Sequence, residues 1–529
     1  MNAYPNVILG DMSAIREKGI EYYQDNFFWP VPDKEYNDFI SFIHNTYIDL
    51  ILDLDNEYIF DIALVEYSFL VTVLEGVFHY NYVKQFSQQH DISLISGEDS
   101  YHYLNPDWDN HATYYSRLDF PFGKMKRYFR RIVRNILFNR HLPILTLFKS
   151  FFIKSQVVGI GSYDDLKKEF VEKNGYYCDH IDWVDLLRSE PIKECKNQNR
   201  WSRSLIENVV TPFLKSIQNH DSYFVKNIDF QLIHKTWATR FLMASGIYEK
   251  LLNIKKPKCL LVTETAKQHS KLFSTAFQKS DCKVYCFYHG NDTGLKIYKN
   301  RHRHVEAHCR YLVVPTKGIA RELTKNYIDD KVDKRTGTEY VSVDSIFYEN
   351  ILRQSTRTKR ASKVKKVMLL GTPANPNRYV HEHGQFFYIK VDLEYRLIKA
   401  LKLGGYEVIY KAHPDRLEEV KGLFENVVDE YCTHPFEDVW QKADAFLFTD
   451  TASTTFGLSL PTNKHIVLMD NSIDQKNHHV EGLLNKRIRS VSMCLNESMR
   501  MKFNNNELYY ALNNQFDTID YSIINEVLL

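Results

Sequence analysis

The feature that most constrains this chain is an alternation of short apolar runs with longer amphipathic stretches, which begins at Cys259. The runs CLLVTE, KVYCFYHG and YLVVPT are separated by stretches such as TAKQHSKLFSTAFQ, whose apolar residues recur at helical spacing. Runs that are apolar throughout indicate strands buried on both faces, and strands that alternate with helices are typical of parallel βαβ units. We therefore expect a Rossmann-like α/β domain over residues 241–352.

A second alternation follows, and it is the clearer one. KVMLLGT predicts a strand, DLEYRLIKALKLGG a helix that ends in a glycine pair suited to a C-cap, and YEVIYKAHP the next strand. Further predicted strands are AFLFTD and HIVLMD. We expect a second Rossmann-like domain at 367–485. Residues 353–366, with seven basic residues and no acidic one, are expected to be the linker between the domains.

The rest of the chain predicts helices. Residues 1–240 are expected to form a largely helical N-terminal region and residues 486–529 C-terminal helices. Within the first of these, residues 124–154 hold nine Lys or Arg and no acidic residue. Arg127, Arg130, Arg131 and Arg134 follow helical spacing, opposite Phe129, Val133, Ile136 and Leu137. Such a helix can lie on an anionic lipid surface, or it can be a basic face packed on its own protein. The sequence leaves both interpretations open.

Composition excludes several classes of protein. A hydrophobic fraction of 44% and a charged fraction of 25% are ordinary for a globular protein, and a net charge of +2 gives no global field for a nucleic-acid partner. The eight scattered cysteines, the missing signal segment and the lack of an apolar run of about 18 residues indicate a reduced, cytoplasmic chain. We expect it in the cytoplasm, either free or at the inner face of the cytoplasmic membrane, and without a cofactor. Zinc at Cys282, Cys286 and His289 is disfavoured, because a strand points successive side chains to opposite faces.

Polar residues follow three strands of the second predicted domain. In an open parallel sheet, ligands bind outside the carboxyl ends of the strands, where loop amides and helix N-termini converge. The segments GTPANP, KAHPDR and TDTAST occupy these positions. The candidate donor-binding residues are Gly371, Thr372, Lys411, His413, Pro414, Asp450, Ser453 and Thr454. Pro414 holds the His413 imidazole at the strand mouth, where it can donate to a phosphate and assist catalysis. Ser453 and Thr454 can cradle an anion, or they can simply cap the next helix.

The first predicted domain supplies acidic residues at two strand ends. Glu264 ends the first strand, and Asp292 follows the His289-Gly290 turn after the next. Either carboxylate can deprotonate an acceptor hydroxyl or attack an anomeric carbon. Glu264 is the preferred catalytic residue and Asp292 the second, with the alternative that Glu264 caps the following helix. His289 and the acidic pair Glu98 and Asp99, which lies among aromatic residues suited to sugar stacking, are candidates for the acceptor site.

The C-terminal half also resembles a known group of families. A K-x-H-P strand end, an A-D pair, a T-D-x-x-S loop and a K-x-I/V-x-x-x-D strand follow in that order. The residues that carry this pattern are Lys411, His413, Pro414, Ala443, Asp444, Thr449, Asp450, Ser453, Lys464 and Asp470. The pattern is similar to bacterial surface-polysaccharide transferases of GT-B architecture: Kdo transferases, CDP-glycerol glycerophosphotransferases and His-Pro-motif sialyltransferases. The resemblance covers roughly residues 255–480.

This resemblance implies a fold and a function. The fold is GT-B-like, with two Rossmann-like domains facing a cleft, and His413 and Ser453 contact the phosphate of a CMP- or CDP-linked donor. One departure is Gly457, where several of these families have an acidic residue; Glu382 or Asp450 could replace it. We expect a metal-independent glycosyltransferase that moves a CMP-activated ulosonic acid from a nucleotide-sugar donor to a glycan or glycolipid acceptor. The alternatives are a CDP-polyol phosphotransferase, a sugar-nucleotide epimerase and a degenerate binding module.

Overall fold

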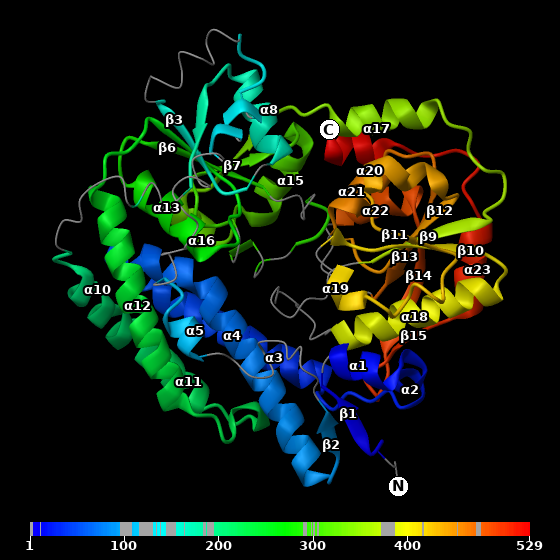
Figure 1. Cartoon of the computed structure of the whole chain (residues 1–529), viewed down its shortest axis with the longest axis horizontal. Helices are drawn as coiled ribbons and strands as arrows, with labels where there is room; N and C mark the ends of the chain where they lie inside the picture. Colours follow the sequence, from blue (N-terminus) through cyan, green and yellow to red (C-terminus); the bar gives the residue numbers. More distant parts are fainter. Residues whose placement is uncertain are drawn as a thin grey trace.

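Two lobes, each built around a parallel sheet, make up the structure, which is a computed structural model of the whole chain (Figure 1). It describes residues 4–10, 12–95, 108–115, 131–133, 135–137, 139–143, 155–162, 164–182, 187, 195–288, 294–297, 299, 302–303, 306–371, 387–414, 417–451, 453–471 and 478–529. The expected fold class, mixed α/β with parallel sheets, is confirmed.

The sheet of the first lobe has six parallel strands. In spatial order they are β4 (Cys178–His180), β3 (Val157–Ile160), β5 (Cys259–Val262), β6 (Lys283–Phe287), β7 (Tyr311–Val314) and β8 (Glu339–Ser342). Counted along the chain, the order is 2-1-3-4-5-6, a doubly wound arrangement. The expectation of a largely helical region up to residue 240 is wrong for β3 and β4. These strands have only four and three residues, too few to show a periodicity.

The sheet of the second lobe has six parallel strands and a seventh, antiparallel one at its edge. The spatial order is β11 (Glu430–Cys432), β10 (Glu407–Lys411), β9 (Lys366–Leu370), β12 (Ala445–Phe448), β13 (His465–Asp470), β14 (Arg489–Leu495) and β15 (Met501–Phe503). The parallel strands follow the Rossmann order 3-2-1-4-5-6. The expectation of helices alone over 486–529 is wrong, because β14 and β15 extend the sheet. β14 alternates polar and apolar residues, a weaker signal than the apolar inner strands give.

Helices cover both sheets. In the first lobe they include α8 (Asp165–Lys173), α13 (Gln268–Gln278), α15 (Lys317–Tyr327) and α16 (Lys331–Thr336), whereas α17 (Phe347–Thr356) lies beside the second lobe in Figure 1. In the second they include α18 (Phe387–Leu403), α19 (Leu417–Val420), α20 (Phe436–Val439), α21 (Thr454–Ser459), α22 (His478–Arg487) and α23 (Asn505–Asn513). Because α17 ends at Thr356 and β9 begins at Lys366, only residues 357–365 of the expected linker are free of helix and strand.

The N-terminal region forms a helical layer on the first lobe. Its main helices are α3 (Asp33–Leu52), α4 (Glu57–Gln89), α5 (Trp108–Ala112), α10 (Gln198–Leu205), α11 (Thr211–Gln218) and α12 (Phe230–Asn253). Both α4 and α12 pack against α13, which covers β5 and β6. Most of α4 is buried, as expected for a helix that is apolar on nearly all sides. No helix among the described residues is both long and apolar enough to cross a membrane.

A buried ion pair fixes α12 to α4. Glu66 and Arg240 are fully buried, and the Arg240 guanidinium donates to the Glu66 carboxylate through Nε. The same guanidinium lies 3.5 Å from the centre of the Phe69 ring and donates to the His111 carbonyl at 3.0 Å. The Tyr115 hydroxyl also donates to Glu66. One ion pair thus joins two long helices to the segment 108–115.

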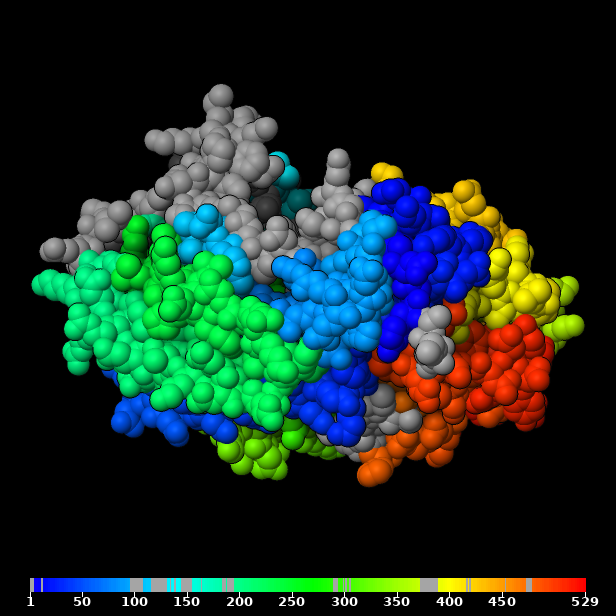
Figure 2. All heavy atoms as spheres, turned by 90° about the horizontal axis from the view of Figure 1, so that it is seen from below, coloured from blue at the N-terminus to red at the C-terminus, as the bar shows by residue number. Residues whose placement is uncertain are grey.

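Segments near the two ends of the chain pack on the opposite lobe. α1 (Met12–Lys18) and α2 (Ile20–Asp25) lie against the second lobe, as the dark blue surface beside the yellow residues in Figure 2 shows. There Gln24 and Arg500 both donate to the buried Asp392 carboxylate, at 2.8 Å each. The π-helical turn η6 (Ile524–Leu528) packs on α15 of the first lobe, where the Gly318 amide donates to the Leu529 carbonyl at 3.0 Å.

We predict that Glu66→Ala lowers the free energy of unfolding by about 3–5 kcal/mol, because the variant leaves the Arg240 charge buried without its partner. Urea unfolding followed by circular dichroism measures this. Replacing both residues by Met should restore much of the stability, since no buried charge remains. Asp38→Asn, which breaks the exposed pair with Lys34, is the control and should change stability by less than about 1 kcal/mol. An equal effect of Glu66→Ala and Asp38→Asn would contradict the prediction.

Candidate functional site

The second sheet has its topological switch point between β9 and β12, because the chain leaves β9 toward β10 on one side and returns to β12 on the other. Ligands of open α/β sheets bind at such points. The residue after β9 is Gly371, and a Cβ there would lie 2.9 Å from the Tyr410 ring and 3.3 Å from the Lys411 carbonyl oxygen. A glycine is therefore needed where the backbone leaves β9. Thr372 lies outside the described residues.

Lys411 and His413 lie at the end of β10, next to β9. Lys411 is buried, and its ammonium donates to the carbonyl of Ala412 at 2.7 Å. Burial lowers the pKa of Lys411, while Cys432 and Glu437 raise it. The Lys411 ammonium thus stabilises the backbone where β10 ends. His413 is half-buried and Pro414 exposed, so the imidazole stands at the border between the sheet edge and solvent.

The loop after β12 contains Asp450, Thr451, Ser453 and Thr454. Ser453 is the N-cap of α21, and its hydroxyl oxygen accepts from the Phe456 amide at 3.1 Å. The helix-capping role that the sequence left open is therefore present; the hydroxyl hydrogen can still donate to another group. Thr451 is buried, and its hydroxyl oxygen has no hydrogen-bond partner within the described part of the chain.

Asp450 forms an ion pair with Lys296 of the first lobe. Nζ of Lys296 lies 3.2 Å from Oδ1 of Asp450, and the two side chains are 5% and 28% exposed. Lys296 belongs to the segment between β6 and β7, so the pair joins loops at the carboxyl ends of both sheets. Sequence reasoning missed Lys296, which lies in no periodic pattern and whose partner is 154 residues away.

Glu264 lies at the switch point of the first sheet, between β3 and β5. There the backbones approach so closely that a Cβ on Gly161 would lie 2.7 Å from the Thr263 carbonyl oxygen. Glu264 has a φ of 59°, a left-handed conformation that costs a non-glycine residue on the order of 1–2 kcal/mol. Its carboxylate, 27% exposed, lies 2.9 Å from Nζ of Lys267. The N-cap residue of α13 is Lys267, whose side chain makes no capping hydrogen bond. That Glu264 interacts with the N-terminus of this helix stays a prediction.

A buried lysine braces the same switch point. Lys167, the third residue of α8, is fully buried, and its ammonium donates to the carbonyls of Ile160 and Ser162 at 3.2 and 3.1 Å. It also lies 3.1 Å from Nε2 of His180 on β4. Lys167 therefore ties the ends of β3 and β4 together. Sequence reasoning missed it, since a lysine in an amphipathic helix predicts an exposed residue.

A second buried lysine lies one turn into α13. Lys271 donates to the Ser68 hydroxyl at 2.6 Å, and the nearby Tyr114 hydroxyl lies 3.2 Å from Nδ1 of His269. Burial lowers the pKa of Lys271 to about 7, although Glu66 raises it, and burial lowers that of His269 to about 3. The helical layer thus contributes polar groups beside the turn that carries Glu264.

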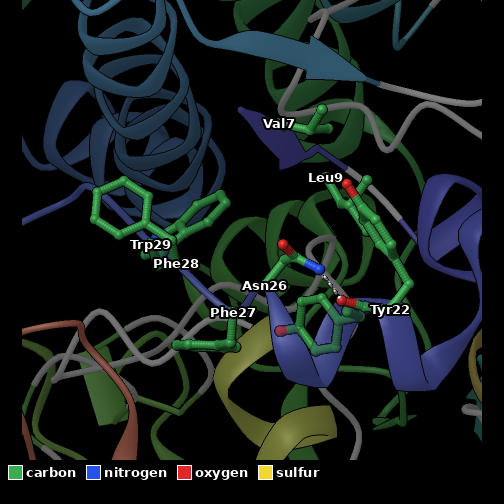
Figure 3. Close-up of a pocket in the computed structure, with 8 residues that line it drawn as sticks. Val7, Leu9, Tyr22, Asn26, Phe27, Phe28 and Trp29 are labelled. Carbon is green, nitrogen blue, oxygen red and sulfur yellow. Dashed lines mark hydrogen bonds between the residues drawn. The ribbon is translucent and has the colours of Figure 1, made fainter. Parts of the chain in front are cut away.

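The other residues predicted from the sequence fall elsewhere. Asp292, His289, Glu98, Asp99 and Glu382 lie outside the described residues. Across the described ranges, no group of three or more His, Cys, Asp or Glu side chains could hold a metal ion. A pocket lined by aromatic rings, including Tyr22, Phe27 and Trp29, lies in the N-terminal segment, where Asn26 donates to the Tyr22 carbonyl (Figure 3). None of the candidate site residues lines it.

Comparison with known proteins gives matches among solved structures. No family model matches the chain, and no curated protein matches it. Three of the matching structures are forms of the wall teichoic acid polymerase TagF. The first has 12% identity and a TM-score of 0.27, covering 67% of this chain and 80% of TagF. A substituted variant has the same identity and TM-score, covering 66% and 79%. A variant soaked with CDPG has 10% identity and a TM-score of 0.27, covering 66% and 80%.

The low pKa of Lys271 predicts a dependence of stability on pH. Between pH 7 and about 10 the unfolded chain keeps a proton on this lysine that the folded chain has lost, so this contribution to the free energy of unfolding rises with pH. Urea unfolding at several pH values should show this rise, up to about 1.4 kcal/mol per pH unit, in the wild type relative to Lys271→Met. Lys283→Met, at an exposed position on β6, should keep the wild-type profile. Parallel profiles for the wild type and Lys271→Met would contradict the prediction.

Proposed function

We propose that this chain is a transferase that moves a group from a cytidine-linked donor to a surface-polymer acceptor and releases CMP. The observation that carries the proposal is the ion pair between Lys296 and Asp450. It joins the carboxyl-end loops of two parallel sheets, which are the edges where such sheets bind ligands. In the GT-B arrangement that we propose, one lobe holds the donor and the other presents the acceptor.

The donor phosphate belongs to the second lobe. Asp450, Thr451 and Gly371 lie at its switch point, and His413 follows the neighbouring strand. His413 and the hydroxyls of Thr451 and Ser453 can donate hydrogen bonds to a phosphate. Hydrogen bonds of this kind, formed in a partly dry site, stabilise the charge that develops on a leaving phosphate. We prefer a cytidine-linked donor because the sequence pattern around Lys411, His413 and Ser453 resembles transferases that use CMP- or CDP-linked donors.

The first lobe supplies the base. The Glu264 carboxylate lies at the end of β5, half-buried, in a backbone conformation that the surrounding structure must hold in place. Strained residues of this kind are concentrated at functional sites. In the proposed reaction, Glu264 accepts the proton of the acceptor hydroxyl while the oxygen attacks the donor.

Two donor classes fit this chemistry. With a CMP-linked sugar, the acceptor oxygen forms a bond to the anomeric carbon, and the bond between that carbon and the phosphate oxygen breaks. With a CDP-linked polyol, the oxygen attacks the outer phosphorus, and the anhydride bond breaks. In both cases the electron pair leaves with CMP, and the proton passes to Glu264. Release of CMP therefore tests the proposal for either donor.

The first experiment measures CMP and CDP binding by calorimetry, and then CMP release from CMP-linked sugars and CDP-linked polyols with glycan and glycolipid acceptors. We expect binding of a cytidine nucleotide and acceptor-dependent release from one donor class. Glu264→Gln should lower kcat at least about 100-fold, because the base is lost, with little change in nucleotide affinity. His413→Ala should also lower turnover strongly. Glu339→Gln, at an exposed strand position in the same lobe, is the control. The absence of cytidine nucleotide binding would overturn the proposal.

We also propose that the basic segment 124–154 contacts an anionic membrane. Around residue 135 it covers β4, the edge strand of the first sheet: Asn135 and Asn139 accept hydrogen bonds from the amides of His180 and Cys178. Val133 and Ile136 are 53% and 46% exposed. Arg131 pairs with Asp179, so one of the predicted arginines packs on its own protein. Arg127, Arg130 and Arg134 lie outside the described residues.

This contact is tested with vesicles that contain phosphatidylglycerol. A variant with Val133→Ser, Ile136→Ser and Gln at positions 127, 130 and 134 should no longer sediment with them, because both apolar insertion and charge attraction are removed. Arg131 is kept, since it holds the segment to Asp179. A variant with Gln in place of Arg353, Arg357 and Lys359 is the control for net charge and should sediment like the wild type. Unchanged sedimentation of the first variant would show that the segment only covers the sheet edge.

A further inference from the structure

Lys296 is held firmly in the first lobe. Next to it, Gly294 has a φ of 74° and lies so close to α15 that a Cβ would be 2.7 Å from Cβ of Glu322. Asn326 of the same helix donates to the Gly294 carbonyl at 3.1 Å. Leu295 is 1% exposed and belongs to the hydrophobic core. The segment before the lysine is therefore anchored to α15, and the ammonium reaches the second lobe from a fixed base.

The surroundings of the buried Lys296 ammonium favour the binding of an anion. Removing a lysine charge from water costs several kcal/mol unless an opposite charge compensates it. The Asp450 carboxylate, 3.2 Å away, supplies that charge, and it is more exposed than the ammonium. Next to Asp450, the buried hydroxyl of Thr451 has no partner in the described ranges. The Lys296 ammonium thus contacts Asp450 at the switch point of the second sheet, and the next residue in the chain, Thr451, carries a buried hydroxyl that can donate.

We propose that Lys296 is a donor-phosphate ligand supplied by the first lobe, and that Asp450 holds it in place until the donor binds. This inference rests on the proposed function and adds a residue to its donor site. The donor phosphate accepts hydrogen bonds from the Lys296 ammonium and the Thr451 hydroxyl. The negative charge of the phosphate then balances the buried ammonium in place of Asp450. Asp450 is then a competitor of the phosphate for the same cation.

Lys296 thus exchanges Asp450 for the donor phosphate, and this exchange couples donor binding to the contact between the lobes. In the empty protein the ion pair joins the two strand-end loops directly. With the donor bound, the phosphate lies between them, and the lysine of one lobe completes the site of the other. Because the cation comes from the lobe that carries Glu264, the donor is bound most tightly when both lobes are in place for reaction.

The experiment measures the binding of CDP and of inorganic pyrophosphate by calorimetry. Lys296→Gln should weaken both about 10- to 100-fold, and Lys296→Arg should restore most of the loss, because the charge is kept. Asp450→Asn should tighten both several-fold, since the competing charge is gone. Lys299→Gln, at an exposed position three residues further on, is the control and should bind like the wild type. Circular dichroism checks that each variant is folded.

Four outcomes decide between the proposals. Weakening by Lys296→Gln together with tightening by Asp450→Asn supports the exchange. Equal affinity of Lys296→Gln and the wild type overturns it and leaves the proposed function intact. If the wild type binds pyrophosphate but no cytidine nucleotide, and Lys296→Gln weakens the binding of pyrophosphate, Lys296 is a phosphate ligand and the proposed function is overturned. Wild-type protein that binds neither overturns both.

Discussion

A parallel sheet is apolar on both faces, and this structure depends on how both faces of two such sheets are covered. In the first lobe the cover includes the N-terminal helices, which reach the sheet through α13. Their attachment is partly polar: the buried pair of Glu66 and Arg240 and the hydrogen bond from Lys271 to Ser68 lie inside the helical layer. In the second lobe, α2 packs on α18 around the buried Asp392. The N-terminal helices therefore belong to the fold, because they cover faces of the two sheets.

The two switch points have different characters. At the first, Gly161 and Thr263 touch, Lys167 binds the loop carbonyls, and Glu264 presents a carboxylate from a strained backbone. At the second, Gly371 allows the backbone to turn beside Tyr410, and the buried Thr451 hydroxyl and the Asp450 carboxylate lie in the loop after β12. In the proposed reaction, Glu264 of the first lobe accepts a proton, and side chains of the second lobe donate hydrogen bonds to the donor phosphate. Lys296 of the first lobe contacts the second lobe through Asp450.

The sequence predicted the inner strands of both sheets because they are apolar along their whole length, as in KVMLL and AFLF. It missed β3, β4, β8, β11, β14 and β15, which are short, interrupted by glycine or exposed on one side. The strand-end loops with His413, Asp450 and Ser453 were also found, since the carboxyl ends of parallel strands meet at one edge. Lys167 and Lys296 were not, because the local pattern around each gives no sign of burial. Their roles come from partners brought together only by the fold.

The packing of α2 on the second lobe also sets an order of events during synthesis. Gln24 contacts Asp392 and Arg500, which follow it by 368 and 476 residues. At a translation rate of about 5–20 residues per second, these partners leave the ribosome on the order of tens of seconds later. Until then α2 lacks the second-lobe surface to which Gln24 binds. Residues that are made early are thus among the last to reach their final contacts.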